Sequence, residues 1–394
     1  MLLRFITLFS ILSTFTVNAA QLDSFNEKLS KSIANELIKQ SIPGAAYTVV
    51  RNNQIIAMEN FGYTDKTNKS KVDNNTVFRL ASVSKPFAAT IAIMLAQEKK
   101  LNLSDPITKF LPNFALATKG AADKIQLKHL LSHSSGLMPN AYDNLLHENW
   151  NMAKIISRFD RVTPICRPAK CYGYQNIAYG FLQPAIEAVT KKSYASLLQE
   201  RIFSPLKMDN ASVGIDVFLT QNNTAKPHIL RKRIKTGQKT RAGKDIRRYI
   251  WRTVDVEPDY YKVAPAAGVN ASITDLAKWL IANLGNNPEV LSPALLTELT
   301  IPRIRTKKDL RRRYWREHLS DAHYGYGWRI YQFEGHPIIY HSGWVAGYRA
   351  DIGYSPTLDI GFAILINAES NVINKISSQF WVQAHELYLS NNKR

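Results

Sequence analysis

A serine and a lysine stand three residues apart in the stretch "RLASVSKPFAAT" (79–90), directly before an apolar run. We expect a strand to end at Ala81 and a helix to begin at Ser82, which places Lys85 on the same helix face as that serine. Serine is a weak nucleophile until a base takes its proton, and lysine can be that base when burial keeps it neutral. Pro86 suits the first turn of such a helix. The stretch predicts a nucleophile and its base; alone, it also fits a serine helix cap followed by a solvated lysine.

Two later segments favour the nucleophile and base over the helix cap. Ninety-two residues after the serine, "YGYQNIAYGFL" contains Tyr174 and Asn176. After a further 167 residues, "IIYHSGWVAGYRADIGYSP" contains His341, Ser342 and Gly343 on an expected strand that leads into a glycine-bearing turn. Ser-x-x-Lys, Tyr-x-Asn and a basic residue followed by Ser/Thr-Gly are, in this order, the three elements of the penicillin-recognising serine hydrolases.

The segments between these elements carry the same likeness. They include "LKHLLSHSSGL" (127–137), "VAPAAGVNASITDLAKWL" (263–280), "YGYGW" (324–328) and "GFAILIN" (361–367). The chain resembles the class C β-lactamase group of penicillin-binding serine hydrolases, which includes D-alanyl peptidases and β-lactamase-like esterases. The resemblance extends from about residue 25 to 390.

The resemblance implies a role for each matching residue. Ser82 would attack a carbonyl and become acylated, while Lys85 would hold or take its proton. Tyr174 would carry protons to the leaving group and activate the deacylating water. Asn176 would orient the lysine and the substrate amide. The backbone N–H groups of Ser82 and Trp344 would form an oxyanion hole, where loss of one donor commonly costs about 3 kcal/mol.

The third element departs from the pattern of many β-lactamases. His341 stands where those enzymes have lysine, a fixed cation that can hold a substrate carboxylate, whereas histidine near neutrality is often uncharged. His341, Ser342 and Gly343 are the expected substrate-binding part of the strand. Arg349, in "GYRAD", or one of the basic segments is the alternative partner for a carboxylate, and Trp344 is expected to narrow the cleft for an apolar acyl group. The histidine weakens the case for efficient β-lactam hydrolysis without excluding it.

A second candidate for the third element is Lys235-Thr236-Gly237 in "RIKTGQ". It lies in a strongly basic run with no alternation of apolar residues, whereas the element belongs on an interior strand. We therefore expect these three residues to lie in a loop away from the site.

The positioning elements follow from the apolar patterns along the chain. Residues 22–40 have helical periodicity, a β-hairpin is expected next, and strands return near the C-terminus before a final amphipathic helix. Strands at both ends predict an α+β fold in which an antiparallel sheet is flanked by terminal helices. We expect one catalytic domain over 21–394, with an α/β lobe (about 21–100 and 286–394) and an inserted, mostly helical lobe (about 101–285).

Charge is concentrated in two segments of a 394-residue chain whose net charge is +20. Residues 228–252 contain ten Lys/Arg and one Asp, a net charge of +9, and residues 302–317 contain eight Lys/Arg and two acids, a net charge of +6. Such a field concentrates anions. Both segments predict contact with an anionic envelope surface rather than nucleic acid; a solvated basic insertion is the alternative.

The first twenty residues, "MLLRFITLFSILSTFTVNAA", have the basic start, apolar centre and small final residues of a cleaved signal peptide. We therefore expect a periplasmic or secreted protein. Cys166 and Cys171 are the only cysteines, and export favours a bridge between them without establishing it. Two cysteines and scattered histidines predict no metal site and no cofactor.

The leading hypothesis is an exported serine hydrolase that forms an acyl-enzyme with β-lactam or D-alanyl-peptide amides, and whose substrate is a small molecule or a fragment of peptidoglycan. A carboxylesterase of the β-lactamase-like type is the first alternative. A catalytically weak protein that binds the envelope through its basic face is the second. The sequence leaves the natural substrate, the deacylation rate and the oligomeric state open.

Overall fold

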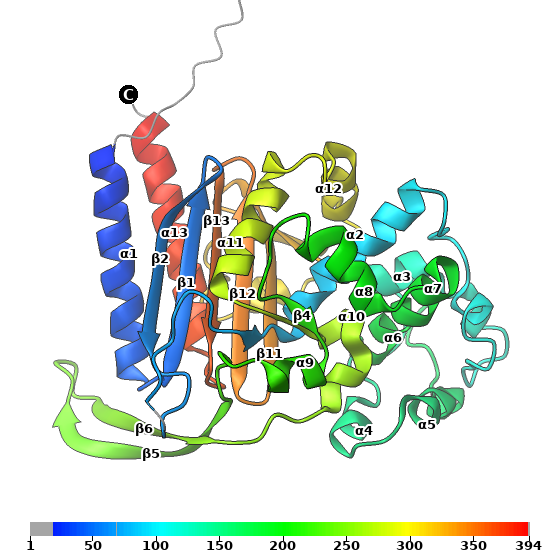
Figure 1. Cartoon of the computed structure of the whole chain (residues 1–394), viewed down its shortest axis with the longest axis horizontal. Helices are drawn as coiled ribbons and strands as arrows, with labels where there is room; N and C mark the ends of the chain where they lie inside the picture. The colour runs from blue at the N-terminus through cyan, green and yellow to red at the C-terminus, as the bar shows by residue number, and fades with distance from the viewer. Residues whose placement is uncertain (1–18, 68, 393–394) are drawn as a thin grey trace, which may run out of the picture.

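The structure is a computed structural model that describes residues 19–67 and 69–392 (Figure 1). Its centre is an eight-stranded, wholly antiparallel sheet. In spatial order the strands are β2 (Gln54–Gly62), β1 (Gly44–Arg51), β13 (Ile360–Ile366), β12 (Tyr348–Ser355), β11 (His336–Val345), β10 (Arg329–Phe333), β9 (Leu319–Tyr324) and β8 (Ile304–Arg305). The two ends of the chain therefore meet in one sheet, and the predicted fold class is confirmed.

The central strands are buried on both faces, which explains their continuous apolar sequences. All seven residues of β13, "IGFAILI", are buried, and so are seven of the eight in β1. The edge strand β2 is exposed or half-buried along its whole length. Its polar residues suit an edge, where unpaired backbone groups face water.

Helices cover both faces of the sheet. The terminal helices α1 (Ala19–Lys39) and α13 (Val372–Asn392) pack together on one face, side by side at the left of Figure 1. On the other face α11 (Ile273–Ile281) packs against β1 and β13. This helix falls inside the segment 101–285, whose assignment to a helical lobe stays a prediction.

The remaining helices form a second layer around α2 (Ser84–Gln97). Every residue of α2 from Ser84 to Leu95 is buried, so this helix runs through the interior of the molecule. The other helices are α3 (Leu127–Leu131), α4 (Asp143–His147), α5 (Met152–Ser157), α6 (Asn176–Gly180), α7 (Leu182–Thr190), α8 (Tyr194–Leu198), α9 (Ile215–Thr220), α10 (Ala264–Ala267) and α12 (Pro293–Thr300). A small sheet of β3 (Phe78–Arg79), β7 (Val269–Ala271) and β4 (Ser212–Val213) lies beside α2.

The basic segment 228–252 forms a two-stranded arm that extends below the sheet (Figure 1). It consists of β5 (His228–Lys239) and β6 (Asp245–Thr253), and Trp251 anchors its base by donating to the Gln40 carbonyl at 2.9 Å. The expectation that Lys235-Thr236-Gly237 lie in a loop is wrong, because these residues belong to β5. Pairing between β5 and β6 stabilises these residues as a strand, although their polar sequence does not predict one.

Three further observations bear on the expectations from sequence. The predicted signal segment, residues 1–20, lies outside the described residues except for the last two, which begin α1. Across residues 19–67 and 69–392, no helix combines the length and apolarity needed to cross a membrane. The sulfur atoms of Cys166 and Cys171 form a disulfide, which settles the question that the sequence left open.

Candidate active site

The residue before the candidate nucleophile has a strained backbone. Strand β3 ends at Arg79, a 3-10 turn covers Ala81–Val83, and α2 begins at Ser84, so the helix starts two residues later than predicted. Ala81 has φ +50°, in the left-handed region that L-residues seldom adopt. Gly343 of β11 packs directly against this turn, because a Cβ there would lie 2.1 Å from the Leu80 carbonyl oxygen. The glycine therefore allows β11 to reach the serine.

Two serines stand in this turn, and their surroundings differ. Ser84 is fully buried, and its hydroxyl accepts a hydrogen bond from the Val269 N–H at 2.9 Å. Ser82 is only half-buried, and its Oγ lies 3.2 Å from Lys85 Nζ. Ser84 therefore ties the turn to β7, and Ser82 is the serine with a base beside it.

Lys85 is held as a neutral base would be. Its Nζ contacts the Asn176 Oδ1 at 2.7 Å and the Ala266 carbonyl at 3.1 Å, and both partners only accept hydrogen bonds. Its side chain is 0% exposed, and this burial holds its pKa well below the usual range, although the charge of Asp143 opposes the shift. A neutral amine with two N–H groups so engaged directs its lone pair at the remaining partner, the Ser82 hydroxyl.

Tyr174 lies beside the lysine of this turn. Burial raises its pKa to about 12, against the opposing effects of the Arg329 charge and of a hydrogen bond with Ser82. Lys85 Nζ lies 4.6 Å from the centre of its ring, and the His133 ring centre lies 4.1 Å away. The phenol is therefore protonated at neutral pH, and its ring lies beside the lysine that contacts the nucleophile.

A carboxylate that the sequence interpretation missed fixes Asn176. The amide donates through Nδ2 to Asp143 Oδ2 at 2.7 Å, and Tyr260 contacts the same oxygen at 3.4 Å. The carboxylate thereby sets which end of the amide faces Lys85. No local pattern marks Asp143, because it lies 33 residues before its partner, at the start of the short helix α4. We refer to Ser82, Lys85, Tyr174 and Asn176 as the serine cluster.

His341 lies behind this cluster rather than on the cleft surface. It is 0% exposed; its Nδ1 lies 3.0 Å from the Ser342 carbonyl and its Nε2 lies 2.9 Å from the Tyr324 hydroxyl. The carbonyl requires a proton on Nδ1, so Nε2 accepts from the tyrosine. Burial and the charge of Arg329 hold the His341 pKa well below its usual range. The structure therefore gives His341 the role of a neutral residue that positions its neighbours, and not the substrate contact expected from sequence.

The side chains of Trp344 and Arg349 bond to partners outside the cleft. Trp344 is 60% exposed and donates to Glu369 Oε1 at 2.8 Å. Arg349 donates to Asn371 Oδ1 at 3.2 Å, and its guanidinium lies 5.2 Å from the centre of the Trp344 ring. Neither lines the cleft, so neither narrows it nor offers it a cation.

The backbone of β11 does reach the cleft. Its pairing with β10 ends at Tyr340, which leaves one strand edge open beyond that residue. Along a strand, the backbone N–H and C=O groups of successive residues point to opposite edges. The two-residue turn pairs Phe333 with His336, so the even-numbered residues of β11 direct these groups towards β10. Ser342 and Trp344 therefore direct their N–H groups to the open edge, beside the turn that holds Ser82. This placement suits the oxyanion hole expected from the resemblance.

A cleft of about 1030 Å³ opens beside the cluster. Tyr174 and Ser342 contribute to it, together with residues 304–312, which carry many cations. The other lining residues are Pro139, Asn140, Lys170, Cys171, Tyr172, Ile304, Arg305, Lys307, Lys308, Asp309, Arg311, Arg312 and Arg329. The basic segment 302–317 thus contributes one side of the cleft, whereas the basic arm does not line it.

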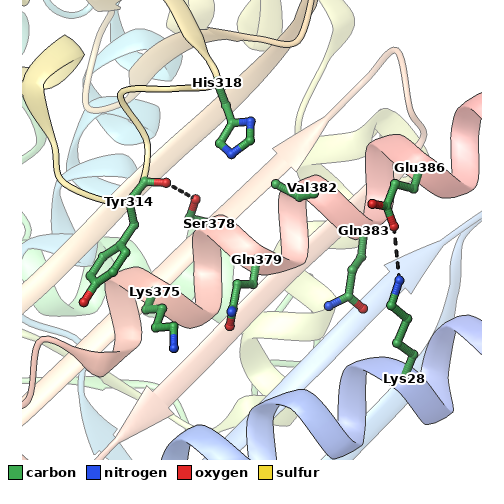
Figure 2. Close-up of a pocket in the computed structure, with 9 residues that line it drawn as sticks. All are labelled: Lys28, Tyr314, His318, Lys375, Ser378, Gln379, Val382, Gln383 and Glu386. Atoms are coloured by element: carbon green, nitrogen blue, oxygen red, sulfur yellow. Dashed lines mark hydrogen bonds and ion pairs between the residues drawn. The ribbon is translucent and has the colours of Figure 1, made fainter. Parts of the chain in front are cut away.

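A smaller hollow of about 290 Å³ lies on the opposite face of the sheet, beside α1 and α13 (Figure 2). Two pairs of its polar groups bond to each other: Lys28 pairs with Glu386 at 3.2 Å, and the Ser378 hydroxyl donates to the Tyr314 carbonyl. Within the described part of the chain, no group of three or more His, Cys, Asp or Glu side chains is arranged to hold a metal ion. The large cleft is therefore the candidate site.

A family model described as "Beta-lactamase" matches residues 25–378. The chain belongs to the β-lactamase family. This match confirms the resemblance found in the sequence, and it places the chain among proteins that are in general serine hydrolases.

Other members of the β-lactamase family show how far the likeness extends. Protein flp of Staphylococcus aureus (strain N315) is 25% identical over 352 residues, which cover 89% of this chain and 64% of that protein. Penicillin-binding protein 4* of Bacillus subtilis (strain 168) is 32% identical over 167 residues, 40% of this chain and 35% of that protein. The chain thus spans about 64% of the length of the flp relatives.

A solved structure shares the fold. The octameric penicillin-binding protein homologue from Pyrococcus abyssi superposes with a TM-score of 0.74 at 23% identity, covering 92% of this chain and 77% of that one. Identity at this level shows a common β-lactamase-type fold and leaves the substrate to be argued from the site.

Proposed function

We propose that the protein is a serine hydrolase that forms an acyl-enzyme through Ser82 and cleaves amides of the D-alanyl-peptide or β-lactam type. The observation that carries the proposal is the contact of the Ser82 hydroxyl with a buried amine, Lys85, whose Nζ lies 4.6 Å from the ring centre of a protonated phenol, Tyr174. A nucleophile between a base and an acid is the arrangement that acyl transfer requires.

The first step moves one proton and forms one bond. Ser82 Oγ attacks the substrate carbonyl, and its proton passes to the neutral Lys85 amine. The N–H groups of Ser82 and Trp344 face the developing oxyanion, in the manner of preorganised donors that stabilise a tetrahedral intermediate. When the C–N bond breaks, Tyr174 gives its proton to the leaving nitrogen and regains one from the lysine. Water then attacks the ester and releases the acid and the free serine.

The neutral histidine bears on the choice of substrate. A family member with lysine at the position of His341 has a cation there for a substrate carboxylate, and this chain does not. Arg329 lines the cleft instead, with its guanidinium 5.6 Å from the centre of the Tyr174 ring. We propose that the cations of the cleft take over carboxylate binding, which keeps D-alanyl amides ahead of uncharged esters.

The proposal includes export. It rests on the first twenty residues, and the Cys166–Cys171 disulfide is of the kind that persists in oxidising compartments. Mass spectrometry of the N-terminus of the protein recovered from its host cells tests this part, with cleavage near residue 20 expected. An intact N-terminus on a cytosolic protein would contradict it.

Intact-mass spectrometry after mixing with a penicillin tests acylation. The wild type is expected to gain the mass of one penicillin, and the Ser82→Ala variant is expected to gain none. Values of kcat/KM for nitrocefin, a D-Ala-D-Ala peptide and p-nitrophenyl butyrate then rank the substrates. Rapid turnover of the butyrate with no penicillin adduct would favour the esterase, and absence of both would favour a binding protein.

A further inference from the structure

The cations of the cleft are mostly unneutralised. Seven Lys or Arg side chains line it against one carboxylate, Asp309. Only two of the seven have an acidic partner: Arg329 pairs with Asp309 at 2.5 Å, and Arg305 pairs with Asp321 at 3.0 Å. Throughout the described residues, the other five have no ion pair. These five are Lys170, Lys307, Lys308, Arg311 and Arg312, which we call the basic wall.

Arg312 is the member of the basic wall with the most constrained side chain. Its guanidinium donates to the Tyr331 hydroxyl at 2.9 Å and to Asn374 Oδ1 at 2.6 Å, and it lies 3.5 Å from the Tyr340 hydroxyl. These three partners are neutral, so they orient the guanidinium without cancelling its charge, and the carboxylate whose charge acts on it, Asp309, is already paired with Arg329. A half-buried cation of this kind is costly unless an anion faces it.

The rest of the basic wall is placed for long-range attraction. Lys170, Lys307, Lys308 and Arg311 are exposed, and they surround the same cleft that Tyr174 and Ser342 line. A concave surface with charges of one sign focuses its field and raises the local concentration of the opposite charge. The basic wall is therefore an anion site beside the reacting groups rather than a general property of the surface.

The basic arm provides the internal comparison. It carries a larger excess of charge, but its cations project into solvent on an extended hairpin and line no described part of the cleft. One of them, Lys235, pairs with Asp245 at 2.8 Å. Net charge therefore does not distinguish the basic arm from the segment 302–317. The difference is that only 302–317 lies beside the serine cluster.

We infer that the preferred substrate is polyanionic, with two or more carboxylate or phosphate groups outside the scissile amide that bind the basic wall. This inference rests on the proposed acyl transfer at Ser82. It places the specificity of the enzyme in residues 307–312 and Lys170. A substrate with a single carboxylate engages only part of the wall, and a neutral ester engages none of it.

Charge reversal in the wall tests the inference. The variant is Lys307→Glu/Lys308→Glu/Arg311→Glu, and all three side chains are exposed. The substrates are D-Ala-D-Ala peptides that carry one or three carboxylates, together with p-nitrophenyl butyrate. We expect kcat/KM to fall about thirtyfold or more for the tricarboxylate, about threefold for the monocarboxylate and less than about twofold for the ester.

The matched control makes the same change of charge on the basic arm. Lys232→Glu/Arg247→Glu/Arg248→Glu alters three exposed cations of β5 and β6. It is expected to change kcat/KM by less than about twofold for every substrate, because the charges lie outside the cleft. Equal losses in the two variants, or equal losses for all substrates in the wall variant, would overturn the inference.

A binding measurement separates this inference from the proposed function. Calorimetry with the Ser82→Ala protein measures affinity for triglutamate and for tripolyphosphate without turnover. Wall reversal is expected to weaken one or both at least tenfold, and the stronger ligand identifies carboxylate or phosphate as the preferred group. Binding that the wall variant leaves unchanged would refute the anion site, even where acylation of Ser82 has been demonstrated.

Discussion

Lysine side chains occupy two contrasting places in one cleft. Lys85 in the serine cluster is fully buried, and it contacts Asn176 and a backbone carbonyl rather than an acid. Lys307 and Lys308 in the basic wall are exposed and have no ion pair among the described residues. Burial converts the first ammonium into a base, whereas water keeps the other two as cations. Solvation, and not residue type, therefore decides whether a lysine takes a proton or attracts an anion.

The two places should affect different kinetic constants. Contacts in the serine cluster are short and dry, so they act on the chemical step. The basic wall acts through its field before the chemistry begins, so it should affect KM and the association rate.

Removal of the nucleophile should have the largest effect. Ser82→Ala is expected to lower kcat/KM by about four orders of magnitude or more, since no other group in the cluster can be acylated. Steady-state kinetics with a D-Ala-D-Ala peptide and intact-mass spectrometry with penicillin provide the measurement. Affinity for triglutamate should remain within about twofold of the wild type, because the wall is intact. Retained turnover would remove the serine cluster from the mechanism.

A pair of lysine-to-arginine changes compares the two places directly. Arginine keeps the charge but does not lose its proton near neutral pH. Lys85→Arg is expected to lower kcat about a thousandfold, within the range of general-base contributions. Lys308→Arg is expected to change kcat/KM less than about twofold, because the wall needs only a cation. Similar losses from both changes would show that Lys85 acts through its charge, and would contradict the contrast between Lys85 as a base and Lys308 as a cation.

The sequence predicted the parts of this site that local spacing determines. Ser82 and Lys85 meet because they are three residues apart on one turn, and no distant contact is needed to place them together. The apolar patterns at both ends of the chain likewise predicted the antiparallel sheet and its terminal helices, and the order of the three motifs predicted the family. In each case the pattern and the structure concern the same few residues.

Other parts of the site depend on contacts between distant segments, and these the sequence did not show. Asp143 is one aspartate among many until packing brings its carboxylate to Asn176. His341 was expected to bind substrate, but its side chain is fully buried and contacts the Tyr324 hydroxyl. The two basic segments had the same composition signal, and only the tertiary structure shows that 302–317 contributes to the cleft while 228–252 forms an arm.

A change at Asp143 should refine the account of Lys85. The negative charge of Asp143 raises the lysine pKa, against the stronger effect of burial. Asp143→Asn removes that charge, so the pKa should fall further and the neutral base should persist to lower pH. The acid limb of the pH profile of kcat/KM is therefore expected to move to lower pH. The plateau should drop about tenfold, because Asn176 loses a charged hydrogen-bond partner. A shift of the limb to higher pH would contradict the direction assigned to Asp143.

Added salt should produce the smallest effect and act on the wall alone. Between 0.1 and 1 M NaCl the Debye length falls from about 10 to 3 Å, which screens exposed charges far more than buried contacts. For a tricarboxylate D-Ala-D-Ala peptide, KM is expected to rise about fivefold while kcat stays within about twofold. p-Nitrophenyl butyrate serves as the uncharged control, and its KM should not rise. If kcat falls with salt as steeply as KM rises, the wall also takes part in the chemical step, and the division between the two kinds of lysine is too simple.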